Sequence, residues 1–168
     1  MYYFFHGTSL ESFINILKNS KIFASYYLPD SDKKYIRMNN ESKYVFTNIY
    51  VDGLPLKSDE KAGLGRITLI IDPIILKYRI CYFNYGWVGD NNNSLLFNDN
   101  VDTIIDYLLN NYQYPYILTH EVLFKKYIPM QFIIGIICDV SDEKLVTQYM
   151  NKYGYNLSLF NKFPTLIC

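Results

Sequence analysis

Residues 2–24 read YYFFHGTSLESFINILKNSKIFA, and this stretch sets the expected architecture. The first four residues are aromatic, a composition typical of a half-buried strand. Thr8 and Glu11 then stand three residues apart, in the form of a helix capping box. Apolar side chains follow at helical spacing, at Leu10, Phe13, Ile14 and Leu17. We therefore expect a strand over the aromatic run, a turn at His6-Gly7, and a helix with Thr8 as its N-cap.

The rest of the chain alternates short apolar runs with polar loops. Further strands are expected at 22–24, 43–50, 66–71, 80–83, 121–124 and 132–138. Helices are expected at 101–109 and from a cap at Ser141 to a C′ position at Gly154. Loops are expected at 28–42, 52–65 and 84–100. No regular strand–helix–strand alternation is visible, so the sequence predicts an α+β fold and argues against a doubly wound parallel sheet.

Length and charge limit the classes of function. The chain has 168 residues, which fits one domain spanning 1–168. Lys+Arg and Asp+Glu number 16 each, so no broad electrostatic surface for duplex nucleic acid or an acidic membrane is expected. Local contact with the end or a loop of a nucleic acid stays open.

The cysteine pattern and the apolar runs indicate the compartment. Cys81, Cys138 and Cys168 are odd in number and unclustered, which argues against a disulfide framework and a structural zinc site. No HExxH or Cys/His metal spacing appears, so no metal is expected. The N-terminus lacks the pattern of a signal peptide, and the longest apolar stretch is too short to span a bilayer. We expect a soluble, cytoplasmic protein.

Two polar residues stand in apolar strands where chemistry could occur. The first, His6, closes the aromatic strand, and Gly7 lets a ligand approach the backbone closely. The helix N-terminus that follows favours an anionic or amide group of a ligand. On composition alone, a histidine that packs or caps at the strand edge is the simpler interpretation.

The second polar residue, Glu121, begins the apolar run Glu-Val-Leu-Phe. A carboxylate on a buried strand is costly unless it is paired or takes part in chemistry. The alternative is an exposed polar residue at the first position of the strand. Sequence alone leaves both open.

Three blocks, in order, carry a resemblance across residues 1 to 138. The opening Tyr-Tyr-Phe-Phe-His-Gly-Thr-Ser, its helix and Lys-Ile-Phe-Ala resemble ADP-ribosyltransferase domains of the His–Tyr–Glu group. That group includes the poly-ADP-ribose polymerase catalytic domain and DNA-modifying toxins. The run Lys-Tyr-Val-Phe-Thr at 43–47 resembles its aromatic strand. Glu121-Val-Leu-Phe, Tyr127-Ile-Pro and the strand at 132–137 are similar to its late block.

The resemblance implies an ADP-ribosyltransferase-like fold with two packed, mostly antiparallel sheets and an NAD cleft. The implied activity is NAD-dependent mono-ADP-ribosyl transfer to a protein or nucleic acid, with release of nicotinamide. The turn at His6, Gly7 and Thr8 would hold NAD, with His6 on a ribose hydroxyl. Tyr44 or Phe46 would stack on the nicotinamide. Glu121 would stabilise the positive charge that develops at the sugar.

This chain departs from the family pattern in its aromatic strand. The family places a tyrosine inside that strand, whereas Val45 and Phe46 are central here and Tyr44 comes earlier. A one-residue change of register would turn the wrong ring inward. A degenerate domain that binds NAD without turnover therefore stays open.

Two other functions compete with this interpretation. An RNA 2′-phosphotransferase shares a related fold but depends on an Arg–His–Arg–Arg set. This chain has three arginines and no histidine between His6 and His120. A non-catalytic interaction module could use exposed aromatic residues such as Trp87. If the enzyme hypothesis is right, His6 and Glu121 should face one cleft, and the loops at 28–42 and 84–100 should border it.

Overall fold

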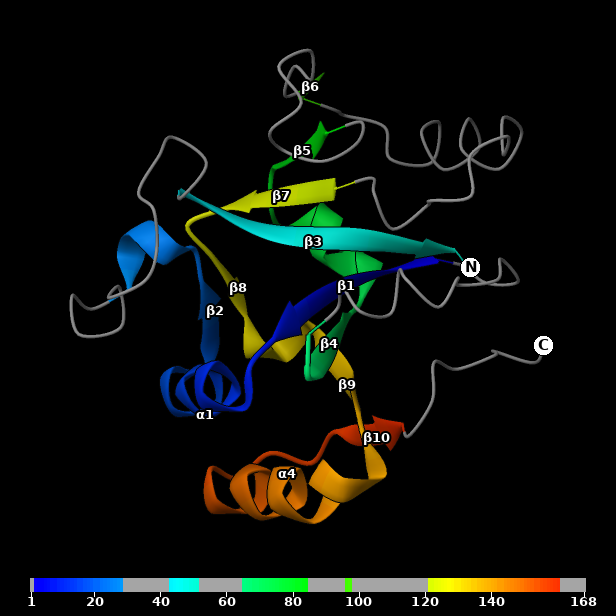
Figure 1. Cartoon of the computed structure of the whole chain (residues 1–168). Coiled ribbons are helices and arrows are strands. Elements are labelled where there is room, and N and C mark those ends of the chain that lie inside the picture. The colour runs from blue at the N-terminus through cyan, green and yellow to red at the C-terminus, as the bar shows by residue number, and fades with distance from the viewer. Residues whose placement is uncertain (1, 29–42, 52–64, 85–95, 98–120, 161–168) are drawn as a thin grey trace.

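The computed structural model describes residues 2–28, 43–51, 65–84, 96–97 and 121–160 (Figure 1). The strands are β1 (Tyr2–Thr8), β2 (Lys21–Phe23), β3 (Tyr44–Val51), β4 (Ile67–Ile71), β5 (Cys81–Asn84), β6 (Leu96–Phe97), β7 (Glu121–Lys125), β8 (Tyr127–Pro129), β9 (Ile133–Cys138) and β10 (Ser158–Phe160). The α-helices are α1 (Leu10–Asn19) and α4 (Val140–Lys152), and short 3₁₀ turns are η1 (Ser25–Tyr27), η4 (Pro73–Lys77) and η6 (Met130–Phe132). The expected helix at 101–109, and nearly all of the expected loops, lie outside the described residues.

The strands form one large sheet and one small sheet. The large sheet has the order β10-β9-β4-β1-β3-β7-β5-β6, and β2 pairs with β8 in the small one. Neighbouring strands are antiparallel except for β9 and β10. The expected α+β fold with mostly antiparallel sheets is confirmed. The pair β5–β6 is a correction, because the strand Leu96–Phe97 falls inside the loop expected at 84–100.

Hydrophobic residues on the two faces of the large sheet form separate clusters. Phe4, Ile49 and Leu69 belong to a large core cluster that also contains Phe13 and Leu17 of α1. Phe5 lies in a smaller cluster with Tyr50, whose ring stacks on it at 4.9 Å. Successive side chains of a strand point to opposite faces, so the aromatic run of β1 supplies both clusters.

The cap of α1 differs from the sequence expectation. Ser9 is the N-cap, and its side chain accepts a hydrogen bond from the Ser12 amide at 3.1 Å. Thr8 stays in β1, where it pairs with Ile67 of β4. Strand pairing therefore carries β1 past the predicted turn at His6-Gly7, and the helix starts one residue later than expected.

The cap of α4 also needs correction. Asp139 takes the N-cap position and Ser141 lies inside the helix, whose first residue is Val140. The C-terminal end agrees with expectation: Gly154 follows the C-cap Tyr153 with a φ of 77°, a conformation that glycine adopts without strain. An ion pair between Arg66 and the buried Asp142 connects the beginning of β4 to this helix.

Candidate functional site

The strands β1 and β3 separate beside His6. Their pairing ends at Phe5 and Asn48, whereas β1 remains paired with β4 as far as Thr8. Within the described residues, the edge of β1 that faces β3 therefore has no strand partner from His6 onward. The His6 ring bridges the gap, since its Nδ1 lies 2.8 Å from the Phe46 carbonyl oxygen. A ligand with amide or hydroxyl groups can use the unpaired backbone edge that this gap leaves.

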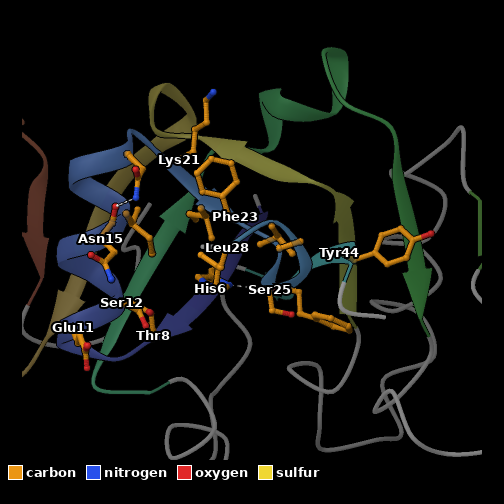
Figure 2. Close-up of a pocket in the computed structure, with 16 residues that line it drawn as sticks. His6, Thr8, Glu11, Ser12, Asn15, Lys21, Phe23, Ser25, Leu28 and Tyr44 are labelled. Carbon is orange, nitrogen blue, oxygen red and sulfur yellow. Dashed lines mark hydrogen bonds between the residues drawn. The ribbon is translucent and has the colours of Figure 1, made fainter. Parts of the chain in front are cut away.

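A cavity of about 650 Å³ lies beside this gap. Figure 2 shows its side chains, which come from β1, α1, β2, η1 and the beginning of β3. The residues of β1 and β3 that line it are His6, Thr8, Tyr44, Val45 and Phe46. Farther along, polar side chains of α1 line the wall, at Glu11, Ser12, Asn15 and Asn19. The volume falls in the range of pockets that hold a small organic molecule or cofactor.

The protonation of His6 follows from its surroundings. Burial lowers the pKa of His6 below its ordinary value of 6.5, and the hydrogen bond to the Phe46 carbonyl opposes that effect. The imidazole is thus neutral at neutral pH. A carbonyl oxygen can only accept, so Nδ1 carries the proton and Nε2 keeps its lone pair. His6 can therefore accept a hydrogen bond from a ligand hydroxyl at Nε2.

The cavity brings together most of the residues expected to bind a cofactor. His6, Thr8, Tyr44 and Phe46 all line it. Gly7 does not line it, although it lies between two residues that do and pairs with Thr68 of β4.

The two aromatic candidates on β3 differ in their surroundings. The Tyr44 ring packs edge-on against Tyr82 of β5 with centroids 5.5 Å apart. In Figure 2 it points away from His6. Phe46 is linked directly to His6 through its carbonyl oxygen. The contact between Phe46 and His6 is made by the backbone of Phe46. The Phe46 side chain, two residues from Asn48, shares the sheet face of Glu121.

Glu121 occupies the first position of β7, and it is buried, with 8% of its surface exposed. The alternative of an exposed strand start is wrong. Glu121 pairs with Asn48 of β3 on one side and with Asn84 of β5 on the other. It is not among the residues that line the cavity.

The side-chain alternation further separates Glu121 from His6. Through Asn48, Glu121 shares a sheet face with Phe5, while His6 shares the opposite face with Phe4. The pair of Phe5 and Asn48 is the last one before β1 and β3 separate. The expectation that His6 and Glu121 line one cavity is not met within the described residues, and only a ligand that passes through the gap could contact both.

Sequence reasoning missed several residues of the cavity wall. Asn15, Asn19 and Lys21 line it from α1 and the beginning of β2, and Ser25 and Leu28 line it from η1 and the residue that follows. The sequence did show that α1 has a polar face opposite its apolar face, and this polar face includes Asn15 and Asn19 of the cavity wall. A polar face is also what a helix shows to solvent, so the pattern could not distinguish a pocket wall from a surface.

A family model places the chain among known sequences. The model of a family of unknown function, DUF5846, matches residues 1–114. The chain belongs to this family. No curated protein matches the sequence significantly. Glu121 lies beyond the matched residues, whereas His6, Tyr44 and Phe46 lie within them.

Solved structures resemble this DUF5846 member over nearly its whole length. Thermus sp. 2.9 DarT in complex with NAD+ is 13% identical, with a TM-score of 0.67 and 95% of each chain covered. The same protein in complex with ADP-ribosylated ssDNA is 12% identical, with a TM-score of 0.69, and 95% of this chain and 93% of that chain are covered. Thermosipho africanus DarTG in complex with ADP-ribose is 10% identical, with a TM-score of 0.61. That match covers 94% of this chain and 49% of the other chain. The DUF5846 chain thus has an ADP-ribosyltransferase-like fold.

The helices α1 and α4 are short beside the thickness of a bilayer. Among the residues that the structure describes, no helix is long and apolar enough to cross a membrane.

Proposed function

We propose that this DUF5846 protein is an NAD-dependent mono-ADP-ribosyltransferase of the His–Tyr–Glu type. It transfers ADP-ribose to a macromolecular acceptor and releases nicotinamide. The observation that carries the proposal is the cavity at the β1–β3 gap, which His6, Thr8, Tyr44 and Phe46 line. The fold it shares with proteins solved in complex with NAD+ and carba-NAD+ supports the choice of ligand.

The residues around the gap offer NAD complementary contacts. The Nε2 atom of neutral His6 accepts a hydrogen bond from a ribose hydroxyl. The backbone of Gly7, on the edge of β1 that has no β3 partner, provides amide contacts for the carboxamide of nicotinamide. Phe46 stacks on the nicotinamide ring, and Tyr44 supports that wall from beside Tyr82.

Glu121 is proposed as the catalytic carboxylate. In the reaction, the bond between nicotinamide nitrogen and ribose C1′ breaks, and a nucleophilic atom of the acceptor bonds to C1′ while its proton leaves to solvent or a base. Positive charge develops on the ribose in the transition state, and a fixed carboxylate nearby lowers the barrier. This role requires the nicotinamide-side ribose to pass through the β1–β3 gap, since Glu121 lies outside the cavity wall.

The proposed acceptor is a nucleic acid. The structure of DarT in complex with ADP-ribosylated ssDNA favours this class of acceptor over a protein. The RNA 2′-phosphotransferase alternative is weaker, because neither of the described arginines lines the cavity. Arg66 is bound to Asp142, and Arg79 donates to the Lys125 carbonyl oxygen.

Nicotinamide release from NAD tests the proposal. The wild-type protein should release nicotinamide in the presence of single-stranded oligonucleotides, and the oligonucleotide should gain the mass of one ADP-ribose group. His6→Ala should weaken NAD binding. Binding of NAD without release by the wild-type protein would identify a degenerate domain, and the absence of NAD binding would leave the interaction module as the better description.

A further inference from the structure

Cationic residues from several segments meet at the turn from β7 to β8. Lys125 ends β7 and Lys126 links it to β8, at a turn that Figure 1 shows beside η1 and the beginning of β3. The backbone holds the neighbouring segments together: the Lys126 amide donates to the Lys43 carbonyl oxygen at 3.0 Å, and the Ala24 amide donates to the Lys126 carbonyl oxygen at 2.8 Å. Arg79 reaches the same turn, since its guanidinium donates to the Lys125 carbonyl oxygen at 2.7 Å. We call Lys21, Lys43, Arg79, Lys125 and Lys126 the cationic strip.

Two cations of the strip share one aromatic ring. Lys21 Nζ lies 4.7 Å from the centroid of the Tyr127 ring, and Arg79 Cζ lies 4.4 Å from it. Each contact is favourable alone, and together they place two positive charges around one ring. Among the described residues, no carboxylate forms an ion pair with either cation. An anionic group next to either cation would therefore gain an attraction that no described carboxylate supplies, which suits a phosphate group of a ligand.

Aromatic rings accompany the cations. Phe23 packs edge-on against Tyr127 with centroids 6.1 Å apart. Tyr26 is 47% exposed and has the Lys43 ammonium 5.9 Å from its ring centroid. Exposed rings beside cations are the combination with which proteins hold unpaired bases and the phosphates between them.

The strip meets the cavity at one edge. Lys21 and Phe23 both line the cavity, and Figure 2 shows them on the opposite side of it from Glu11 and Thr8. A polymer lying on the strip would therefore reach the edge of the cavity that Lys21 and Phe23 line. The whole chain carries no formal net charge, so attraction for a polyanion has to come from a local group of cations such as these.

We propose that the cationic strip binds the phosphates and unpaired bases of a single-stranded nucleic acid and guides it to the cavity. The proposal rests on the proposed function, because it gives the acceptor of the same site a docking surface. A single strand fits better than a duplex, since bases in a duplex are stacked on each other and cannot stack on the exposed ring of Tyr26. An acidic peptide would satisfy the cations but would bring no base to the exposed ring of Tyr26.

Binding of fluorescent oligonucleotides to the full chain, without NAD, tests the strip. The probes are a single-stranded deoxyoligonucleotide of mixed sequence, the matching duplex, and a poly-glutamate peptide of equal charge. The wild-type protein should prefer the single strand. The double variant Lys125→Gln/Lys126→Gln should lower the slope of log affinity against log salt by about 1.4, because each phosphate that a lysine neutralises on a single strand adds roughly 0.7 to that slope. Tyr26→Leu should weaken binding by about fivefold or more, because the base that stacks on the ring has no flat partner in the variant.

The matched control removes the same charge elsewhere. Lys144→Gln/Lys152→Gln takes two lysines from the exposed side of α4 and should leave both the affinity and the salt slope near the wild-type values. Equal losses in the two double variants would show that only net charge matters, and preference for the duplex or for poly-glutamate would overturn the assignment to a single strand.

The outcome for the strip is independent of the outcome for NAD. If the strip variants bind the oligonucleotide as tightly as wild type does, the strip proposal is wrong, whether or not NAD is cleaved. If the strip binds as expected but NAD is neither bound nor cleaved, the proposed function is wrong and the nucleic-acid site stands.

Discussion

The two ends of β1 belong to one continuous strand, but they differ in how many neighbouring strands they pair with. From Tyr2 to Phe5 the strand pairs with β3, and β4 joins it on the other side from Phe4 onward, where Phe4 and Phe5 are fully buried. From His6 to Thr8 it is paired only with β4. A strand with two partners has satisfied its backbone groups and serves as scaffold, whereas loss of one partner leaves polar groups that a ligand can bind. The difference between scaffold and site thus arises from one missing neighbour.

The largest expected effect is on the scaffold end. Phe4→Ala removes a fully buried ring that packs edge-on against Phe124 with centroids 5.8 Å apart. It should lower the free energy of unfolding by about 3–5 kcal/mol. His6→Ala, two residues along, should lower it by only about 1 kcal/mol, because it removes one hydrogen bond. Urea unfolding of both variants measures the contrast, and equal losses would contradict the division of β1.

The next largest effect is expected for a substitution of Glu121, and it should lower the rate of nicotinamide release. Glu121→Gln keeps the shape of the side chain but removes its negative charge, so nicotinamide release should fall on the order of a hundredfold or more while NAD affinity changes little. Turnover and NAD affinity are measured for both proteins. Equal turnover would remove Glu121 from the mechanism. A variant that loses stability but keeps its turnover would show that the buried carboxylate only supports the strand.

A smaller effect distinguishes Ser9 from Thr8 at the beginning of α1. Ser9→Ala removes the acceptor of the Ser12 amide and should lower the free energy of unfolding by about 1 kcal/mol. Thr8→Val retains a β-branched residue in β1 and should cost less, because Thr8 does not cap the helix. Thermal or urea unfolding of the two variants decides between the caps. A greater loss for Thr8→Val would favour the cap that the sequence predicted.

The smallest effect is the pH dependence that His6 contributes. Its pKa in the folded protein is lowered from 6.5, so below that pH the unfolded chain takes up a proton that the folded protein does not. The free energy of unfolding should therefore fall as pH drops below about 6.5, until His6 is protonated in the folded protein too. His6→Gln should lack this part of the decline. Urea unfolding of wild type and variant between about pH 7.5 and pH 5 measures the difference, and parallel curves would show that burial does not affect the imidazole.

Local patterns in the sequence predicted most of the scaffold. The aromatic run of β1, the apolar spacing of α1 and the glycine after α4 each report on a few consecutive residues, and backbone preference and amphipathic periodicity act over that range. The same patterns predicted an α+β fold. They failed at Thr8 and Ser141, because pairing of β1 with β4 and the position of Asp139 decided where the helices begin.

The sequence by itself determined the strand and helix types, the candidate residues His6 and Glu121, and the aromatic strand beside them. Only the tertiary structure decided that β1 and β3 separate after Phe5, that Glu121 is buried outside the cavity wall, and that Lys21 and Arg79 meet on Tyr127. Each of these facts joins segments that are distant in the chain. Neither local backbone preference nor side-chain periodicity extends over such separations, so the site depends on how the strands pair and where a pairing ends.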